Sequence, residues 1–197
     1  MVTTATAVVT IFVIVGVLAA VGSKTPSVKP QNTPTQAAPA QEVPTTPSET
    51  PTPTPTQASD TGPVGTTFTV TGSDGTSYDI TLVKVLDPAQ GANEFSTPEQ
   101  GKRFVGAKFT VKTTAGTVSE NANNNAAIQG SDNQMYTSDF SEISAGTNFN
   151  NGDIHLRKGG SVTGWVTFQV PQNVKVTSVQ WSPESGFSNA VATWTMK

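Results

Sequence analysis

The fold is decided by residues 102–113, which read KRFVGAKFTVKT. Apolar and polar side chains alternate along this stretch. One face carries Val105, Ala107, Phe109 and Val111, and the other carries Lys108, Thr110 and Lys112. Alternation with a period of two residues is typical of a β-strand that buries one of its faces. The stretch therefore predicts a half-buried strand.

The same alternation continues on both sides of this strand. On the N-terminal side, Asp74-Gly75 predicts a tight hairpin turn before the alternating residues of 78–82. On the C-terminal side, residues 131–134 predict a second hairpin turn, and Pro171 ends a further alternating stretch. Residues 138–153 show no repeat and predict a long irregular loop.

No stretch after residue 64 keeps a helical period for more than about two turns. Short strands separated by Gly, Asn, Asp and Pro are typical of an all-β domain. We count seven to nine such strands, which predicts an immunoglobulin-like β-sandwich. Trp181 and Trp194 have apolar neighbours two residues away and are expected in its core.

The composition excludes several kinds of chemistry. The 197 residues contain no cysteine and one histidine, His155, which excludes disulfide scaffolds, thiol nucleophiles, iron–sulfur sites and multi-histidine metal sites. The net charge is -3, so there is no basic surface for nucleic acid. We therefore expect no cofactor and no nucleic-acid partner.

Composition also divides the chain into three segments. Residues 64–197 hold all three Trp, both Tyr and eight of the nine Phe, and they form the expected sandwich domain. Residues 24–63 hold 10 of the 14 Pro and only two large aliphatic side chains, Val28 and Val43, which predicts a disordered Pro/Thr-rich stalk. Residues 1–23 carry no charged side chain.

The apolar segment 1–23 predicts contact with a membrane. As a helix it would be about 34 Å long, enough to cross the hydrocarbon core. The alternative is a signal peptide cleaved after residue 22, but the apolar run exceeds the usual length of about 7–15 residues. We expect a cell-membrane protein with an extracellular domain, or a secreted protein if residues 1–22 are removed.

Lys24 and Lys29 complicate the orientation, because positive charges favour the cytoplasmic side of a membrane. The Pro/Thr-rich segment that follows is typical of surface stalks and favours the outside. We expect the C-terminal domain outside the membrane.

Three stretches carry a resemblance to a known family: YDITLVKV at 78–85, GKRFVGAKFTV at 101–111 and GGSVTGWVTFQVP at 159–171. They resemble a family of extracellular bacterial domains of unknown function, common in secreted or membrane-anchored proteins of Gram-positive bacteria and similar to the mycobacterial immunoprotective secreted antigen. The resemblance implies an immunoglobulin-like sandwich displayed outside the membrane. The chain lacks the lipid-accepting cysteine of many relatives.

Few residues are candidates for chemistry. His155 lies between Ile154 and Leu156, and we interpret it as a surface residue, because no serine motif accompanies it. Four acidic residues of the polar middle could together offer oxygen ligands to calcium, although Asp and Asn also suit turns. These weak candidates are Asp132, Asp139, Glu142 and Asp153.

Trp165 is the aromatic residue with an unusual position. Alternation places it opposite the apolar face of its strand, where an exposed indole could stack on a sugar or anchor a protein. The alternative is that residues 138–153 cover it.

We therefore expect a non-enzymatic binding or structural module held at the membrane surface. The alternative is a cell-wall glycan-binding domain or a glycan-acting enzyme. A cleft lined by two or more acidic residues would favour the alternative, and a flat apolar patch around Trp165 would favour a protein partner.

Overall fold

The computed structural model describes residues 27–30, 60–72, 74–188 and 190–197. The expected anchor at 1–23 and most of the expected stalk lie outside these residues. Within the described part of the chain, no helix has the length and apolarity needed to cross a membrane.

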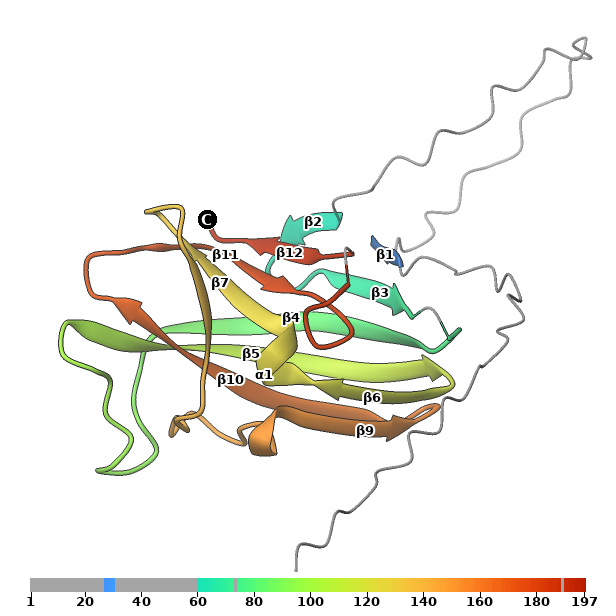
Figure 1. Ribbon diagram of the computed structural model, residues 1–197, viewed down its shortest axis with the longest axis horizontal. Coiled ribbons are helices and arrows are strands. Elements are labelled where there is room, and N and C mark those ends of the chain that lie inside the picture. Colours follow the sequence, from blue (N-terminus) through green and yellow to red (C-terminus); the bar gives the residue numbers. More distant parts are fainter. Residues whose placement is uncertain (1–26, 31–59, 73, 189) are drawn as a thin grey trace, which may run out of the picture.

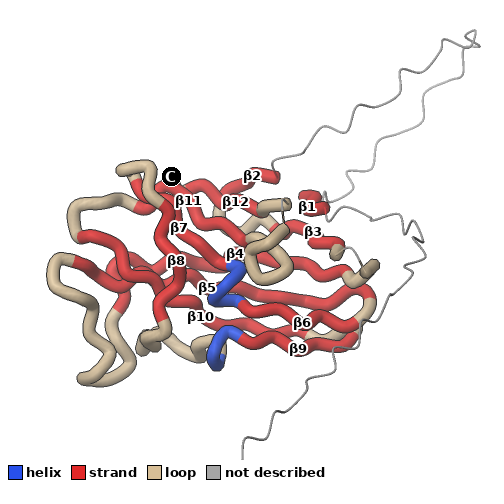
Figure 2. Tube along the Cα trace, viewed as in Figure 1, coloured by secondary structure: helices blue, strands red, loops and turns tan. Residues whose placement is uncertain are grey.

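The described residues are mostly β-strand, with almost no helix, as Figure 2 shows. The strands are β1 (Ser27–Pro30), β2 (Asp60–Pro63), β3 (Thr67–Thr71), β4 (Ser77–Ala89), β5 (Lys102–Ala115), β6 (Thr117–Asn121), β7 (Ala126–Gly130), β8 (Met135–Asp139), β9 (Asp153–Arg157), β10 (Ser161–Pro171), β11 (Val176–Trp181) and β12 (Ala192–Thr195). Two short helical turns complete them, α1 (Ala122–Asn125) and η1 (Asn150–Gly152). The all-β prediction is confirmed, with more strands than the seven to nine expected.

The strands form a sandwich that nearly closes on itself (Figure 1). Ten of them follow the order β1-β3-β4-β5-β10-β8-β7-β11-β12-β2, and β6 pairs with β9 separately. β8 pairs with both β10 and β7, so it connects the two layers. β1 and β2, at the two ends of this order, contact each other. We call this contact between the sheet's two ends the seam.

The alternation that predicted the strands also sets their register. β5 buries Val105, Ala107, Phe109 and Val111 completely, and β10 does the same with Val166, Phe168 and Val170. Both predicted hairpin turns are present. The Gly72 amide donates to the Thr76 carbonyl around Gly75, whose φ is +85°, and the Gly130 amide donates to the Gln134 carbonyl.

An aromatic cluster occupies the centre of the core. The Phe109 ring lies 5.1 Å from the Trp181 ring and 5.8 Å from the Trp194 ring, measured between centroids. Phe68 packs edge-on against Trp194 at 5.2 Å. All four side chains are fully buried, which confirms the expected core positions of the two tryptophans.

β2 begins at Asp60, four residues before the boundary expected at residue 64, and β1 lies within the expected stalk. β2 pairs in parallel with β12, and β1 pairs antiparallel with β3. Asp60, the first residue of β2, is buried. Composition gave no signal for these strands because their pairing uses backbone N–H and C=O groups, which every residue except proline offers in full.

Candidate functional site

Trp165 lies on the outer face of β10, as predicted, but its side chain is only 5% exposed. It packs in a small cluster with Ala89, Phe104 and Ile143. The expectation of an exposed indole is therefore wrong, and the alternative, that the following loop covers it, is right. We do not retain Trp165 as an exposed binding residue.

Backbone hydrogen bonds hold the covering loop on β10. The Trp165 amide donates to the Thr147 carbonyl at 3.0 Å, and the Phe149 amide donates to the Trp165 carbonyl at 3.1 Å. Gly106 of β5 leaves room beneath the loop, since a Cβ there would lie 2.4 Å from Ile143 Cδ1. An apolar residue within an irregular stretch, Ile143, was the sequence signal that this loop packs inward.

The covering loop is joined to a second loop, and together they form one edge of the sandwich. The Ala92 amide donates to the Glu142 carbonyl, and the Ser144 amide donates to the Gln90 carbonyl, each at 2.9 Å. We call residues 90–101 and 140–149 the loop edge. Figure 1 shows both loops extending from the end of the molecule where β4 and β5 are joined.

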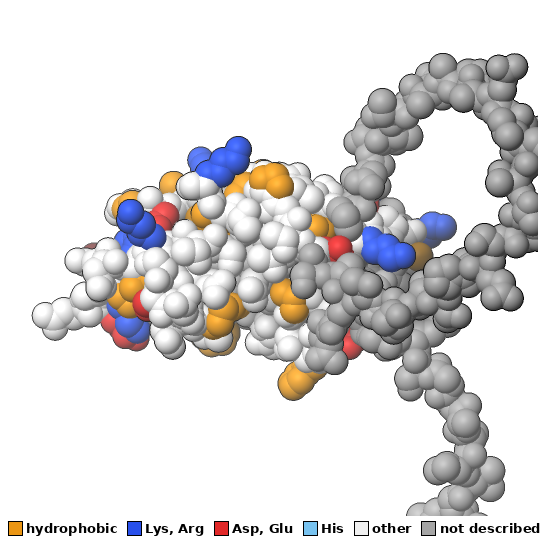
Figure 3. Space-filling model, turned by 90° about the horizontal axis from the view of Figure 1, so that it is seen from above, with side chains coloured by type: hydrophobic (Ala, Val, Ile, Leu, Met, Phe, Trp, Pro, Cys, Tyr) orange, Lys and Arg blue, Asp and Glu red, His pale blue; other side chains and the backbone are white. Residues whose placement is uncertain are grey.

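The loop edge presents two phenylalanines to solvent. Phe95 is 87% exposed and Phe140 is 84% exposed, and among the large apolar side chains of the described residues only Phe187, on the β11–β12 loop, is as exposed. On the face seen in Figure 3, apolar side chains lie in small separate groups on a mostly polar surface. Single exposed apolar side chains are common on proteins, but an exposed aromatic ring is also a side chain that can anchor a partner. Sequence analysis missed both residues, because irregular stretches carry no periodicity from which exposure can be predicted.

Two polar hollows lie at the loop edge, and Phe140 lines the smaller of them. A small one of about 60 Å³ is lined by Phe140 with Asp139, Glu142 and Asn148, among others. A wider one of about 380 Å³ is lined by residues of the other loop, including Asn93 and Ser96.

Asp139 is held firmly in the smaller hollow. Its carboxylate accepts hydrogen bonds from the Gln169 side chain at 2.7 Å and from the Ser141 amide at 2.8 Å. Burial raises the pKa of Asp139, but these hydrogen bonds outweigh it and leave the pKa below its ordinary value. The hollow therefore presents an ionised acceptor beside an exposed aromatic ring.

The four weak calcium candidates do not come together. Asp132 accepts the Tyr136 hydroxyl at 2.6 Å, and Asp153 accepts the Asn121 side-chain amide at 2.9 Å. Only Asp139 and Glu142 line the same hollow. The described residues contain no group of three or more His, Cys, Asp or Glu side chains that could hold a metal ion.

A third hollow, of about 240 Å³, has a buried polar chain at its base. Trp181 Nε1 donates to the Tyr78 hydroxyl at 3.0 Å, and this hydroxyl donates to Glu120 at 3.2 Å. Glu120 also accepts hydrogen bonds from the Asn125 side chain and the Glu184 amide. Burial, followed by the charge of Glu120, raises the pKa of Tyr78 well above its ordinary value. Because Glu120 joins three separate segments, we interpret this chain as structural.

We expect Tyr78→Phe to lower the free energy of unfolding by about 1–3 kcal/mol, because it leaves the buried Trp181 N–H without an acceptor. Chemical denaturation of the full chain measures this change. Tyr136→Phe is the matched control, since its hydroxyl bonds an exposed carboxylate, and it should change stability by less than about 0.5 kcal/mol. Equal effects of the two substitutions would contradict the structural role of the chain.

His155 is exposed on β9, as predicted. Its Nδ1 lies 3.2 Å from the Ser119 hydroxyl of β6, so the two residues form a cross-strand pair. A serine–histidine pair resembles the start of a nucleophilic site, but catalysis also needs a group that orients the histidine. Within the described residues, no carboxylate is hydrogen-bonded to this ring.

Two solved structures from Bacillus subtilis are similar to the chain. One is ycdA, described as a candidate lipoprotein, with 13% identity and a TM-score of 0.46 over 61% of this chain and 36% of that chain. The other is the yjhA protein, with 14% identity and a TM-score of 0.43 over 61% of this chain and 91% of that chain. The chain thus spans about a third of the length of ycdA.

Comparison with curated protein sequences finds no match. The family model described as "Domain of unknown function (DUF4352)" matches residues 69–192, from within β3 to the first residue of β12. The chain therefore belongs to the DUF4352 family.

Proposed function

We propose that this protein is a non-enzymatic binding module, displayed outside the cell membrane, which contacts its partner through the loop edge. The observation that carries the proposal is the pair of exposed phenylalanines, Phe95 and Phe140, on two loops that are hydrogen-bonded to each other. Loops fixed in this way can present aromatic anchors with little loss of conformational entropy on binding.

A binding role fits the chemistry of the described residues better than catalysis does. The Ser119–His155 pair is exposed, and Asp74, Glu120 and Asp139 in the hollows accept hydrogen bonds from neighbouring side chains. Hydrolysis needs a nucleophile, a base and stabilisation of developing charge within one site. These features support a module that acts by recognition.

The partner we favour is cell-wall glycan. An exposed aromatic ring can stack on a sugar, and nearby carboxylate and amide groups can bond its hydroxyls. Phe140 has Asp139, Glu142 and Asn148 beside it in the small hollow. Asp139 and Glu142 line one hollow, a feature expected of a domain that binds or acts on cell-wall glycan, while the buried Trp165 cannot centre a protein-binding patch.

Binding to isolated bacterial cell walls, stripped of protein, tests this proposal. We expect the full chain in detergent to co-sediment with the walls, and Phe95→Ala with Phe140→Ala to weaken that binding at least about tenfold, as loss of two aromatic anchors should. Phe187→Ala is the matched control, because this ring is 88% exposed on a different loop.

A loss of binding in the control equal to that in the double variant would contradict the loop edge as the binding surface. If the parent chain does not co-sediment, the glycan assignment is wrong. A protein partner would then be sought by cross-linking from positions 95 and 140.

A further inference from the structure

The order of the strands changes the interpretation of how the Pro/Thr-rich segment is connected to the domain. β1 pairs with β3 through four residues, with Ser27 opposite Thr71. β2 pairs with β12 and also contacts β1 at the seam. Figure 1 shows β1 and β2 at the same corner of the molecule. Residues 31–59 therefore connect two strands of one domain, so that this segment is attached to the domain at both of its ends.

The charge of Lys29 supports this placement of β1. Burial raises the pKa of Asp60 at the start of β2, and the positive charge of Lys29 partly offsets this effect by lowering it. The Lys29 side chain of β1 is thus close enough to β2 to lower the pKa of the buried Asp60 carboxyl across the seam.

The tether between the expected anchor and the domain is consequently short. Only residues 24–26 separate the segment 1–23 from β1. Three residues reach at most about 10 Å, whereas residues 24–63 as an extended stalk would reach about 120 Å. The first strand thus begins close to the anchor.

We infer that the end of the sandwich where β1 begins lies against the anionic lipid headgroups of the membrane. This inference rests on the proposed display of the domain by residues 1–23. We call this end, formed by residues 71, 72, 74–77, 112–117 and 157–161, the anchor end.

Hydrogen bonds gather the three turns of the anchor end. Gly159 N donates to the Thr113 carbonyl at 2.9 Å, and the Thr113 amide donates to the Gly160 carbonyl at the same distance. The Thr76 hydroxyl contacts the Thr117 carbonyl at 3.5 Å. Strand pairing also brings Ser27 to this end, because Ser27 lies opposite Thr71 and Thr71 lies opposite Ser77.

The side chains of the anchor end suit lipid headgroups better than lipid tails. Three basic residues are exposed in these turns, Lys112, Arg157 and Lys158, against one exposed acid, Asp74. The hollow beside Asp74 is also lined by Glu120 and Glu184. Asp74 is engaged by the amide and hydroxyl of Thr76, each at 2.8 Å. None of the large exposed apolar side chains of the described residues lies at this end. Basic and hydroxyl groups without apolar anchors favour contact with phosphates at a membrane surface.

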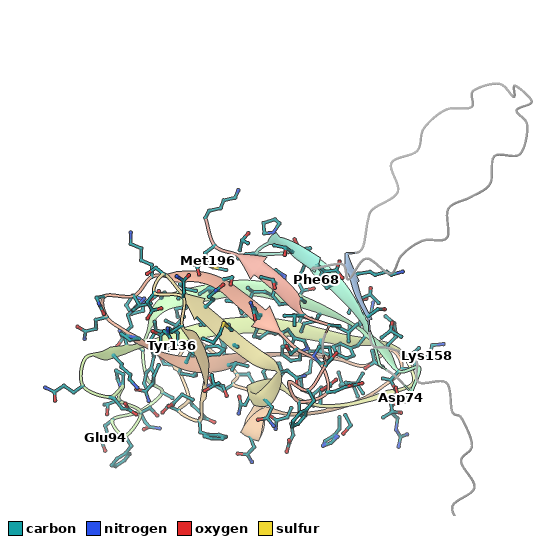
Figure 4. All side chains as sticks on the ribbon, turned by 45° about the horizontal axis from the view of Figure 1, so that its top comes forward. Phe68, Asp74, Glu94, Tyr136, Lys158 and Met196 are labelled. Carbon is teal, nitrogen blue, oxygen red and sulfur yellow. The ribbon has the colours of Figure 1, made fainter. Side chains whose placement is uncertain are left out.

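The loop edge lies at the opposite end of the molecule. Figure 4 shows Asp74 and Lys158 together at one end and Glu94, from the loop edge, at the other. A domain resting on its anchor end would therefore direct Phe95 and Phe140 away from the membrane.

The docking of β1 can be tested by disulfide cross-linking, because the chain has no cysteine of its own. In the full chain reconstituted into vesicles, Ser27→Cys with Thr71→Cys should cross-link on oxidation, since these residues face each other. Ser27→Cys with Thr69→Cys, two residues out of register, is the matched control and should cross-link poorly. Equal cross-linking in both pairs would show that β1 is not docked, and the inference would fail.

The position of the anchor end is tested by fluorescence quenching in the same vesicles. A fluorophore on Lys158→Cys should be quenched by spin-labelled headgroups at least about twofold more than one on Glu94→Cys, and more strongly in anionic than in neutral vesicles. Equal quenching at the two positions, or a chain that does not remain in the vesicles, would overturn the inference. No glycan or protein partner enters this measurement, so its result is independent of wall binding by the loop edge.

Discussion

Replacing Phe109 by alanine is expected to lower the free energy of unfolding by about 3–5 kcal/mol, the usual loss for a buried aromatic side chain. The Phe109 ring contacts both Trp181 and Trp194 and is completely buried. Its removal loses the free energy gained by transferring the ring from water to the core. It also leaves a cavity between two indoles, because their own strands hold them in place.

Urea denaturation of the full chain, with near-ultraviolet circular dichroism as the probe, measures this effect. Phe95→Ala serves as the control, because its ring is 87% exposed and its loss should change stability by no more than about 0.5 kcal/mol. If the two variants unfold at the same urea concentration, the core described here is wrong.

Trp165→Ala is expected to lower the free energy of unfolding by about 3 kcal/mol or more. The indole fills the space between β5 and the covering loop, next to Phe104 and Ile143, so its removal takes away the packing that holds this loop on the sheet. The loop edge should loosen as a consequence, and faster hydrogen exchange at residues 140–149 would report it.

Trp165→Phe separates packing from hydrogen bonding. Trp165 Nε1 has no hydrogen-bond partner within the described residues, whereas Trp181 Nε1 donates to the Tyr78 hydroxyl. We therefore expect Trp165→Phe to be less destabilising than Trp181→Phe, as measured by the same denaturation.

A Trp165→Ala variant as stable as the parent would restore the exposed-indole hypothesis.

The strands that could be predicted from sequence are those whose own side chains carry the signal. In β5 and β10, burial of one face requires an apolar residue at every second position, and this local pattern is readable without knowing the partner strand. The two hairpin turns were equally readable, since Gly75 supplies the positive φ that the first of them requires.

β1 and β2 could not be predicted, because they are defined by the backbone of distant strands. Ser27–Pro30 and Asp60–Pro63 contain proline, glycine and polar residues, and their composition predicts a linker. The edge position tolerates such residues, since only one side of an edge strand needs to pair.

The candidate site was missed for a related reason. Alternation correctly placed Trp165 on the outer face of its strand, but exposure depends on what lies above that face, and the loop that covers it has no periodicity. Phe95 and Phe140 lie in stretches of the same kind, so their exposure follows from the paths of two loops in space. The sequence around Phe95 and Phe140 therefore contains no pattern from which their exposure can be predicted.

The pairing of β2 with β12 has a consequence for biosynthesis. β2 pairs with β12, and Trp194 Nε1 donates to the Thr66 carbonyl at 2.8 Å, so strands from the two ends of the domain must meet before the sheet is complete. A ribosome produces β2 long before β12, and contacts between residues so far apart in sequence form late in folding. Until β12 has been synthesised, the sheet lacks its β2–β12 pair, and Trp194 is missing from the aromatic cluster around Phe109. The pairing of β2 with β12 can therefore form only after every other strand has been synthesised.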